Sequence, residues 1–293
     1  MITLPRSLAV WVADGRRMAR RIRRRVRGTG ARRTIVTGTS SSHFSCLLNL
    51  LHSLELSHVA AELIVYDLGL TPDERDRVAA CRGVEVRTFP FDAYPPHVDI
   101  SVAAGEYAWK PIIVSDVGRE RSGLVLWMDA GDFVFDDLEW IWTRIAEEGI
   151  YTPTSSGTVR RWTHPVTLAA LDAPNDVLTL RNRAAALVGF DTRRQEMLDV
   201  LERWRSAAID PDVIAPPGSD RSNHRQDQAV LTVLYYQAQR ELGFRVVNER
   251  HAVMLHLDSL PAAAVPAAIA ALRRYPQLRH VSWRGPRRVS GTP

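Results

Sequence analysis

Short apolar segments alternate with helical segments in the first half of the chain, and this alternation limits the fold more than any other feature. Segments 33–37, 62–66, 84–89 and 123–128 are typical of β-strands, and the last of them is apolar throughout. Strands that do not alternate polar and apolar residues are typical of a parallel sheet that is covered on both faces. We therefore predict an α/β fold with a mostly parallel sheet and helices on both faces.

Helical spacing of apolar residues predicts the elements that connect these strands. In this half we expect helices over 39–54, 72–82, 107–119 and 136–148. The second half is less regular. There we expect strands at 184–190, 244–247 and 253–257, helices at 192–207, 223–242 and 262–274, and a loop at 211–218.

Positive charge is concentrated at the start of the chain. Residues 1–33 contain eleven Arg and one Asp, whereas the other 260 residues contain 27 basic and 32 acidic side chains. A nucleic-acid-binding domain is expected to be basic over its folded face, so we exclude nucleic acid as the main ligand. We predict three parts: an Arg-rich helical arm (1–32), a globular domain (33–275) and a C-terminal tail (276–293).

The Arg-rich segment 5–27 is predicted to form a helix that Gly28 and Gly30 end. Such a helix can lie on an anionic membrane surface, or it can be a solvated arm. Two cysteines in 293 residues favour a reducing compartment, and no apolar run reaches the ~18 residues that span a bilayer. We expect a cytoplasmic protein that can associate peripherally with the inner face of the membrane.

Polar residues follow three of the predicted strands, at the edge where ligands bind in an open α/β sheet. They are the loop 37–43 (TGTSSSH), Asp67 and Asp129. The loop lacks the GxxxxGK[ST] and GxGxxG patterns. It can bind a nucleotide through backbone N–H groups at a helix N-terminus, or it can only cap that helix.

Asp129 leaves a buried strand directly after Trp127 and Met128. A carboxylate there can hold Mg²⁺ or Mn²⁺ between two phosphates, and the ion would neutralise the charge on a diphosphate leaving group. Alternatively, Asp129 caps the turn, and Asp132 favours the start of the next helix through the helix dipole.

Lys110 is the only lysine in an otherwise arginine-rich chain. A lysine is a compact point charge that suits a single phosphate oxygen, although Lys110 can also be a solvated helix residue. His164 lies between Trp162 and Pro165, where it can line an acceptor pocket or stabilise a turn.

Five short motifs occur in order along the chain, and together they resemble a known family. They are VYDLGL (65–70), YAWKP (107–111), LWMDAG (126–131), RWTHP (161–165) and HRQDQ (224–228). The family comprises nucleotide-diphospho-sugar-transferase-like proteins of bacteria and nematodes, and its layout is similar to that of glycogenin-like glycosyltransferases of the GT-A fold. The resemblance covers about residues 33–257.

The resemblance implies a GT-A type, Rossmann-like domain. This domain would transfer a hexosyl group from a nucleotide-diphosphate sugar to a hydroxyl acceptor, with Mn²⁺ or Mg²⁺ as cofactor. The acceptor would be a glycan, a lipid-linked molecule or a small molecule. The second Asp of the family's Asp-x-Asp motif is Gly131 here, and Asp132 stands one place later. This departure keeps two alternatives open: a non-catalytic nucleotide-sugar-binding module, and a hydrolase of nucleotide sugars.

On this basis we predict three sets of site residues. The predicted catalytic residues are Lys110, Asp227 and Gln228, of which the last two match an Asp-Gln pair at the start of a late helix. The predicted metal ligands are Asp129, Asp132 and His256. The predicted nucleotide-sugar contacts are Thr37, Thr39, Ser40, His43, Asp67, Lys110, Trp127, Asp129, His164 and Asn182.

Overall fold

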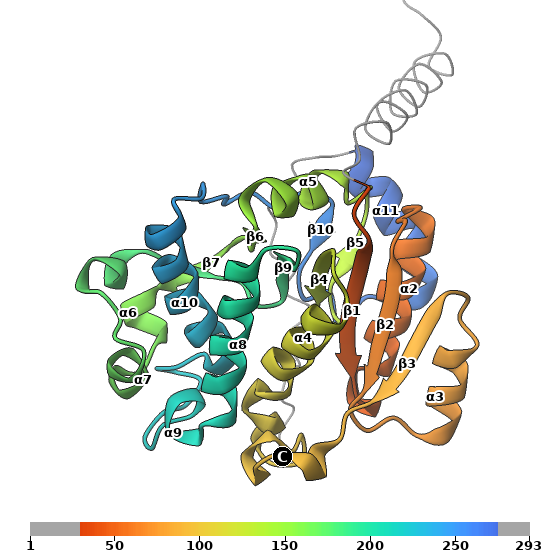
Figure 1. Cartoon of the computed structure of the whole chain (residues 1–293). Helices are drawn as coiled ribbons and strands as arrows, with labels where there is room; N and C mark the ends of the chain where they lie inside the picture. Colours follow the sequence, from red (N-terminus) through yellow and green to blue (C-terminus); the bar gives the residue numbers. More distant parts are fainter. Residues whose placement is uncertain (1–29, 275–293) are drawn as a thin grey trace, which may run out of the picture. The chain divides into compact units, whose positions relative to one another are not determined.

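The computed structural model describes residues 30–274 of the chain (Figure 1). The predicted helix at 5–27 and the predicted tail at 276–293 lie outside the described residues, so their existence and roles stay predictions. Within the described range, no helix is both long enough and apolar enough to cross a membrane.

A six-stranded sheet forms the centre of the described structure (Figure 1). Its strands are β1 (Arg33–Thr39), β2 (Glu62–Asp67), β3 (Val84–Thr88), β4 (Leu124–Met128), β6 (Ile150–Tyr151) and β9 (Leu187–Asp191). They lie in the order β3-β2-β1-β4-β9-β6. The first four are mutually parallel, whereas β9 is antiparallel to both of its neighbours. The predicted α/β class with a mostly parallel sheet is therefore confirmed.

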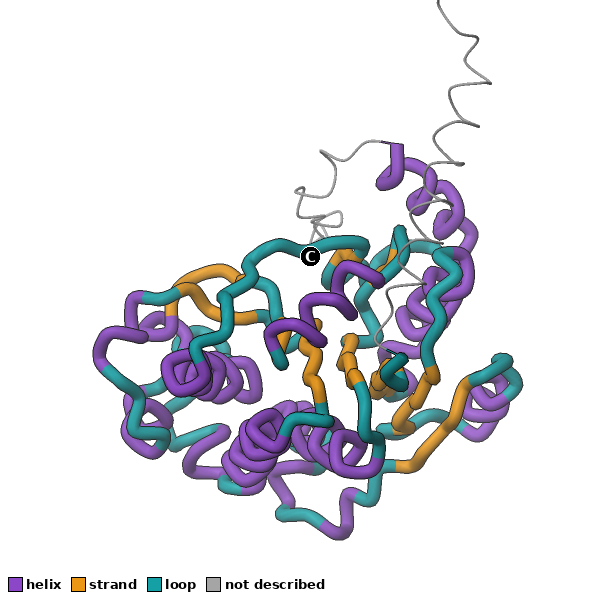
Figure 2. Tube along the Cα trace, turned by 45° about the horizontal axis from the view of Figure 1, so that its top comes forward, coloured by secondary structure: helices purple, strands orange, loops and turns teal. Residues whose placement is uncertain are grey.

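Helices surround the strands in Figure 2 and cover both faces of the sheet. They are α2 (Phe44–Leu56), α3 (Pro72–Ala79), α4 (Trp109–Glu120), α5 (Glu139–Glu148), α6 (Val159–Trp162), α7 (Pro165–Ala170), α8 (Gln195–Ile209), α9 (Pro211–Ile214), α10 (Gln226–Leu242) and α11 (Val265–Arg274). Val36 and Trp127 point to one face, where they pack with α4 and α8. Val65 packs with α2 and α3 on the other face. Both faces are buried because successive strand residues point to opposite sides.

The order of the strands places a crevice between β1 and β4. From β1 the chain proceeds outward to β2 and β3, and it then returns to add β4 on the other side of β1. Ligands bind at the carboxyl ends of strands where the order reverses in this way. Thr39 ends β1, and Asp129 directly follows β4. Both residues therefore lie at the edge where a ligand is expected.

Two short sheets tie distant segments to this edge. β5 (Phe133–Val134) pairs with β10 (Val253–Met254) in antiparallel fashion, and β7 (Thr154–Thr158) pairs with β8 (Arg181–Arg183). Beyond β10, the backbone N–H of Leu257 donates to the carbonyl oxygen of Gly131 at 2.8 Å. The C-terminal part of the domain is thus held beside the loop that follows β4.

Several predictions for the second half are wrong in detail. Residues 244–247 form no strand, because the Arg245 N–H donates to the Glu148 carboxylate at 2.8 Å instead of to a neighbouring strand. The predicted strand at 253–257 is only the two residues of β10. The predicted loop at 211–218 contains α9. These segments are shaped by side-chain contacts that the local pattern does not contain.

Candidate active site

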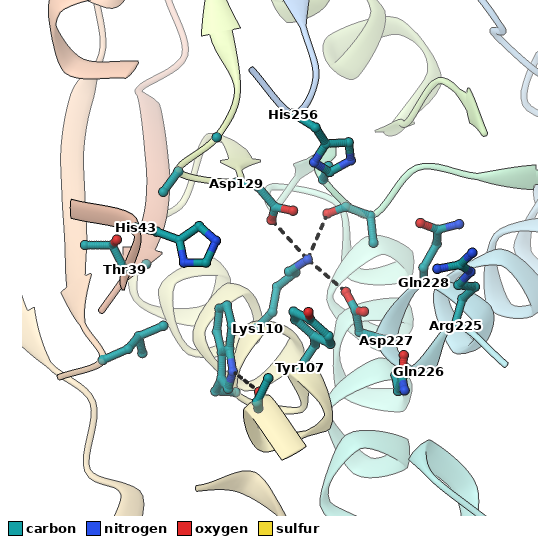
Figure 3. Close-up of a pocket in the computed structure, with 18 of the residues that line it drawn as sticks. Thr39, His43, Tyr107, Lys110, Asp129, Arg225, Gln226, Asp227, Gln228 and His256 are labelled. Carbon is teal, nitrogen blue, oxygen red and sulfur yellow. Dashed lines mark hydrogen bonds and ion pairs between the residues drawn. The ribbon is translucent and has the colours of Figure 1, made fainter. Parts of the chain in front are cut away.

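A cavity of about 770 Å³ opens at the carboxyl ends of β1 and β4. Thr39 at the end of β1 and Ser40 and His43 in the segment after it line one side of the cavity. The start of α10 lines the other side through Asp227 and Gln228. Figure 3 shows Lys110 between these two sides, with Asp129 beside it. The structure thus brings together residues from the first and last thirds of the chain.

Lys110 is buried at the centre of the site, with 3% of its surface exposed. Its Nζ lies 3.0 Å from Asp129 Oδ1 and 3.0 Å from Asp227 Oδ2. It also donates to the carbonyl oxygen of Ala185 at 3.5 Å. The ammonium is therefore surrounded by protein oxygens, and its charge is matched by two carboxylates that come from separate elements.

The two carboxylates differ in exposure. Asp129 accepts a hydrogen bond from Trp127 Nε1 at 2.7 Å, and 27% of its side chain stays exposed. Asp227 lies in the first turn of α10, and only 7% of its side chain is exposed. Asp129 is therefore the carboxylate that offers more of its surface to a ligand, while Asp227 forms part of the cavity wall.

Lys110, Asp129 and Asp227 form an ion group, in which burial and mutual contact shift the pKa values of Lys110 and Asp227. Burial raises the pKa of Asp227, and the Lys110 ammonium works against that rise. Burial alone would lower the pKa of Lys110, but the charges of Asp129 and Asp227 outweigh it and raise the pKa above its ordinary value. Lys110 is thus protonated throughout the physiological range. One ammonium beside two ionised carboxylates leaves net negative charge on this group of three side chains.

Gly131 stands where the Asp-x-Asp motif has its second carboxylate, and the structure shows what fills that space. A Cβ atom built on Gly131 would collide with Asp258 Oδ1. No side chain fits at position 131 while Asp258 holds this position. Asp258 itself lines the cavity. Sequence reasoning missed it, although the sequence places it two residues after His256.

The predicted metal ligands do not come together as a set. Asp129 and His256 line the cavity, whereas Asp132 is buried outside its lining, with 1% of its surface exposed. Burial raises the pKa of Asp132 well above its ordinary value, and the charge of Asp129 adds to this rise. Among residues 30–274, no three His, Cys, Asp or Glu side chains are arranged to hold a metal ion. These residues do not fit a three-ligand Mn²⁺ or Mg²⁺ site, and we derive no catalytic step from one.

Other predicted contacts lie outside the cavity lining, which includes neither Thr37 nor Trp127. Asp67 instead accepts hydrogen bonds from the N–H groups of Gly69 and Leu70 and pairs with Arg75. His164 caps α7 by accepting from the Val166 N–H. Asn182 is buried and accepts from the Thr232 hydroxyl. Asp67, His164 and Asn182 Oδ1 thus serve local structure in this conformation, whereas Thr37 Oγ1 and Asn182 Nδ2 are buried without a hydrogen-bond partner among the described residues.

The cavity is also bordered by backbone in unusual conformations. Ala104, Tyr107, Gln226 and His256 have φ values of 58°, 56°, 39° and 59°, and all four line the cavity. Positive φ is uncommon outside glycine and asparagine. Residues held in such conformations cluster at functional sites, because the surrounding structure must enforce them. This clustering supports a functional role for the cavity.

Comparison with known proteins gives a partial family match. Residues 26–115 match the family described as protein of unknown function DUF1647. No curated protein matches the chain.

Several solved structures are similar to this chain. One is LgtC, a galactosyltransferase in complex with donor and acceptor sugar analogues, at 14% identity and a TM-score of 0.48 over 81% of this chain and 95% of that one. A second is WbbM, a bifunctional glycosyltransferase, at 12% identity and a TM-score of 0.49 over 72% of this chain. This chain spans 38% of the length of WbbM. A third is mouse xyloside xylosyltransferase 1, at 11% identity and a TM-score of 0.43 over 74% of this chain and 85% of that one.

Proposed function

We propose that this chain is a glycosyltransferase that moves a hexosyl group from a nucleotide-diphosphate sugar to a hydroxyl acceptor. The observation that carries the proposal is the ion group of Lys110, Asp129 and Asp227 in the wall of a cavity at the strand ends. Carboxylates held by a lysine are strong acceptors for the hydroxyl groups of a sugar. A volume of about 770 Å³ is within the range of small-molecule sites.

In this proposal the donor lies between the loop after β1 and Asp129. The hydroxyls of Thr39 and Ser40 and the ring of His43 line that side. The start of the helical segment beyond them would favour the negative charge of a diphosphate. Asp129 would accept a hydrogen bond from a donor hydroxyl and orient the sugar.

The acceptor would approach from the side of α10. The bond between the anomeric carbon and the diphosphate oxygen breaks, and a bond from the acceptor oxygen to that carbon forms. Asp227 would take the proton of the acceptor hydroxyl, since burial raises its pKa toward the range of an effective base. Gln228 would hold a sugar hydroxyl beside it, and Lys110 would keep both carboxylates in place.

The test is a panel of UDP-, GDP- and dTDP-sugars with the full chain, with and without Mn²⁺. A ligand at 100 times its Kd adds about 2.7 kcal/mol to stability, which a thermal-shift measurement detects. We expect one nucleotide class to stabilise the wild type and Asp129→Asn to bind it at least about tenfold more weakly. Asp73→Asn is the matched control, because 83% of its side chain is exposed and it lies outside the cavity lining.

Turnover separates the transferase from its alternatives. Release of the nucleoside diphosphate that requires an acceptor supports the transferase, and Asp227→Asn should slow this release by about 100-fold. Release without an acceptor indicates a hydrolase. Binding without release indicates a non-catalytic nucleotide-sugar-binding module. If no nucleotide sugar binds, the proposal is wrong.

A further inference from the structure

Three arginines lie near one another at the start of α10, and we call them the arginine cluster: Arg161, Arg221 and Arg225. The guanidinium carbons of Arg225 and Arg161 lie 4.1 Å and 4.7 Å from the centre of the Trp162 ring. Arg221 donates to the Tyr107 hydroxyl at 3.1 Å. Arg221, Arg225, Trp162 and Tyr107 all line the cavity.

The arginine cluster carries positive charge that the protein does not neutralise. Among residues 30–274, none of its members forms an ion pair with an Asp or Glu. By contrast, Arg33 and Arg87 pair with Glu139 and Glu120 elsewhere in the domain. Burial lowers the pKa of Arg225, and the charges of Arg221 and Arg161 lower it further. Two exposed arginines gathered beside the half-buried Arg225 in this way favour a bound anion.

The cluster lies across the site from the predicted nucleotide loop. In Figure 3, Arg225 and Gln228 lie on one side of Lys110, and Thr39 and His43 lie on the other. Arg225 directly precedes α10, and its N–H donates to the Trp162 carbonyl oxygen at 3.1 Å. This bond ties the end of α6 to the start of α10. Arg221 and Arg225 therefore line the half of the cavity that is left for a second substrate, with Arg161 beside them on Trp162.

The guanidinium planes of Arg161 and Arg225 are also held in place before any ligand arrives. Stacking on an aromatic ring fixes the orientation of an arginine, and Trp162 contacts two of the three. A guanidinium presents paired N–H donors that match the oxygens of a phosphate or a carboxylate. A neutral sugar would leave these donors and their charge unused.

We propose that the acceptor carries a compact anion, a phosphate or a carboxylate, which binds to the arginine cluster while its reacting hydroxyl reaches Asp227. Naming this ligand the acceptor rests on the proposed function, whereas the anion site itself rests only on the cluster. The start of α10, a 17-residue helix, adds favourable potential for an anion beside Arg225.

The experiment measures equilibrium binding of three probes to the full chain: glucose 6-phosphate, glucuronate and glucose. UDP serves as a fourth probe for the opposite side of the cavity. We expect at least one charged sugar to bind about tenfold or more tightly than glucose, and salt to weaken its binding. The phosphate and carboxylate probes identify which anion the site prefers.

The double variant Arg221→Gln/Arg225→Gln should lose this preference and should bind UDP like the wild type. Arg82→Gln is the matched control, since Arg82 is exposed and lies outside the cavity lining. Melting curves of both variants check that the fold is kept, because the cluster residues are at or near the surface.

Three outcomes would overturn the inference: equal affinity for charged and neutral sugars, an unchanged preference in the double variant, or an equal loss of UDP and charged sugar. The last would assign the cluster to the donor. If UDP and nucleotide sugars bind nowhere but the charged sugar still depends on the arginines, the anion site stands and the transferase proposal fails.

Discussion

Lys110 and Arg225 are both cations in the wall of one cavity, yet they are held in opposite ways. The Lys110 ammonium lies 3.0 Å from each of two carboxylates. Arg225 lies on the ring of Trp162 and has no acidic partner among the described residues. A cation that is paired with acidic side chains of the protein holds those side chains in position. A cation without such partners is available to a ligand. The sequence predicted Lys110 as the phosphate contact, and the structure offers the arginines as the freer charges.

Replacing the lysine should give the largest effect. Lys110→Met leaves Asp129 and Asp227 facing each other without a cation, and breaking a buried ion pair in this way costs about 3–5 kcal/mol. We expect this loss in the free energy of unfolding, measured by denaturant titration of the ligand-free protein.

A rescue variant sharpens this test. Adding Asp129→Asn and Asp227→Asn to Lys110→Met removes the unmatched charges and should recover most of the stability. Exposed Arg82→Met serves as the control for loss of one positive charge. An unaltered melting temperature in Lys110→Met would mean that the ion pairs of Lys110 do not stabilise the protein. Lys110 would then not differ from Arg225 in this respect.

The second prediction concerns the histidine that supports the arginine side. His224 Nε2 lies 2.9 Å from the Ile214 carbonyl oxygen, and Nδ1 accepts from the His164 N–H. Burial lowers the pKa of His224 from 6.5 to about 4. The unfolded chain therefore binds an extra proton between these values. The contribution of a neutral His224 to the free energy of unfolding is fully present above pH 6.5. It should fall by about 3 kcal/mol as the pH drops to 4.

Denaturant titration at several pH values measures the slope of the free energy of unfolding against pH. His224→Gln should flatten the part of the slope that His224 contributes, while His52→Gln on α2 should leave it unchanged. If both variants show the same pH dependence of unfolding as the wild type, the arginine side does not depend on a neutral His224.

Asp132 is a buried carboxylate for which the charge of Lys110 does not offset the cost of burial. The pKa of Asp132 is raised, first by burial and then by Asp129. Its ionisation therefore destabilises the native state as the pH rises from the unfolded pKa through the raised native pKa. Asp132→Asn should stabilise the protein by about 1 kcal/mol at pH 8, with a smaller gain at pH 4. A loss of stability at pH 8 would argue against a penalty for this carboxylate.

The smallest effect is expected for the ring under the arginines. Trp162→Leu removes the stacking of Arg225 and Arg161, which is worth about 0.5–1 kcal/mol near a surface. Binding of glucose 6-phosphate should weaken about threefold, with UDP binding as the reference that stays constant. A loss as large as that of the double arginine variant would mean that Trp162 contacts the ligand directly.

The sequence predicted well those helices and strands that are specified by residues close together in the chain. The helix α3 begins at Pro72, after Thr71, which forms a reciprocal pair of hydrogen bonds with Glu74. Such signals lie within four residues of each other and can be read from the chain. The parallel strands β2 and β4 were visible for the same reason, since their apolar runs at 63–66 and 124–128 are continuous. Lys110, Asp129 and Asp227 were also predicted as site residues, through motifs and resemblance, and the structure places all three in one cavity lining.

The contacts among those residues were decided only by the tertiary structure. Lys110 and Asp227 are 117 positions apart, and nothing local indicates that the ammonium meets two carboxylates rather than a ligand. The same holds for Asp258, which reaches the space beside Gly131 because β10 pairs with β5. In the first half of the chain, sequence by itself determined which segments are buried and regular, because burial and capping there follow from neighbouring residues. Only the packing of the whole chain decided which charges are matched and which stay available, because ion pairing depends on distances between separate elements.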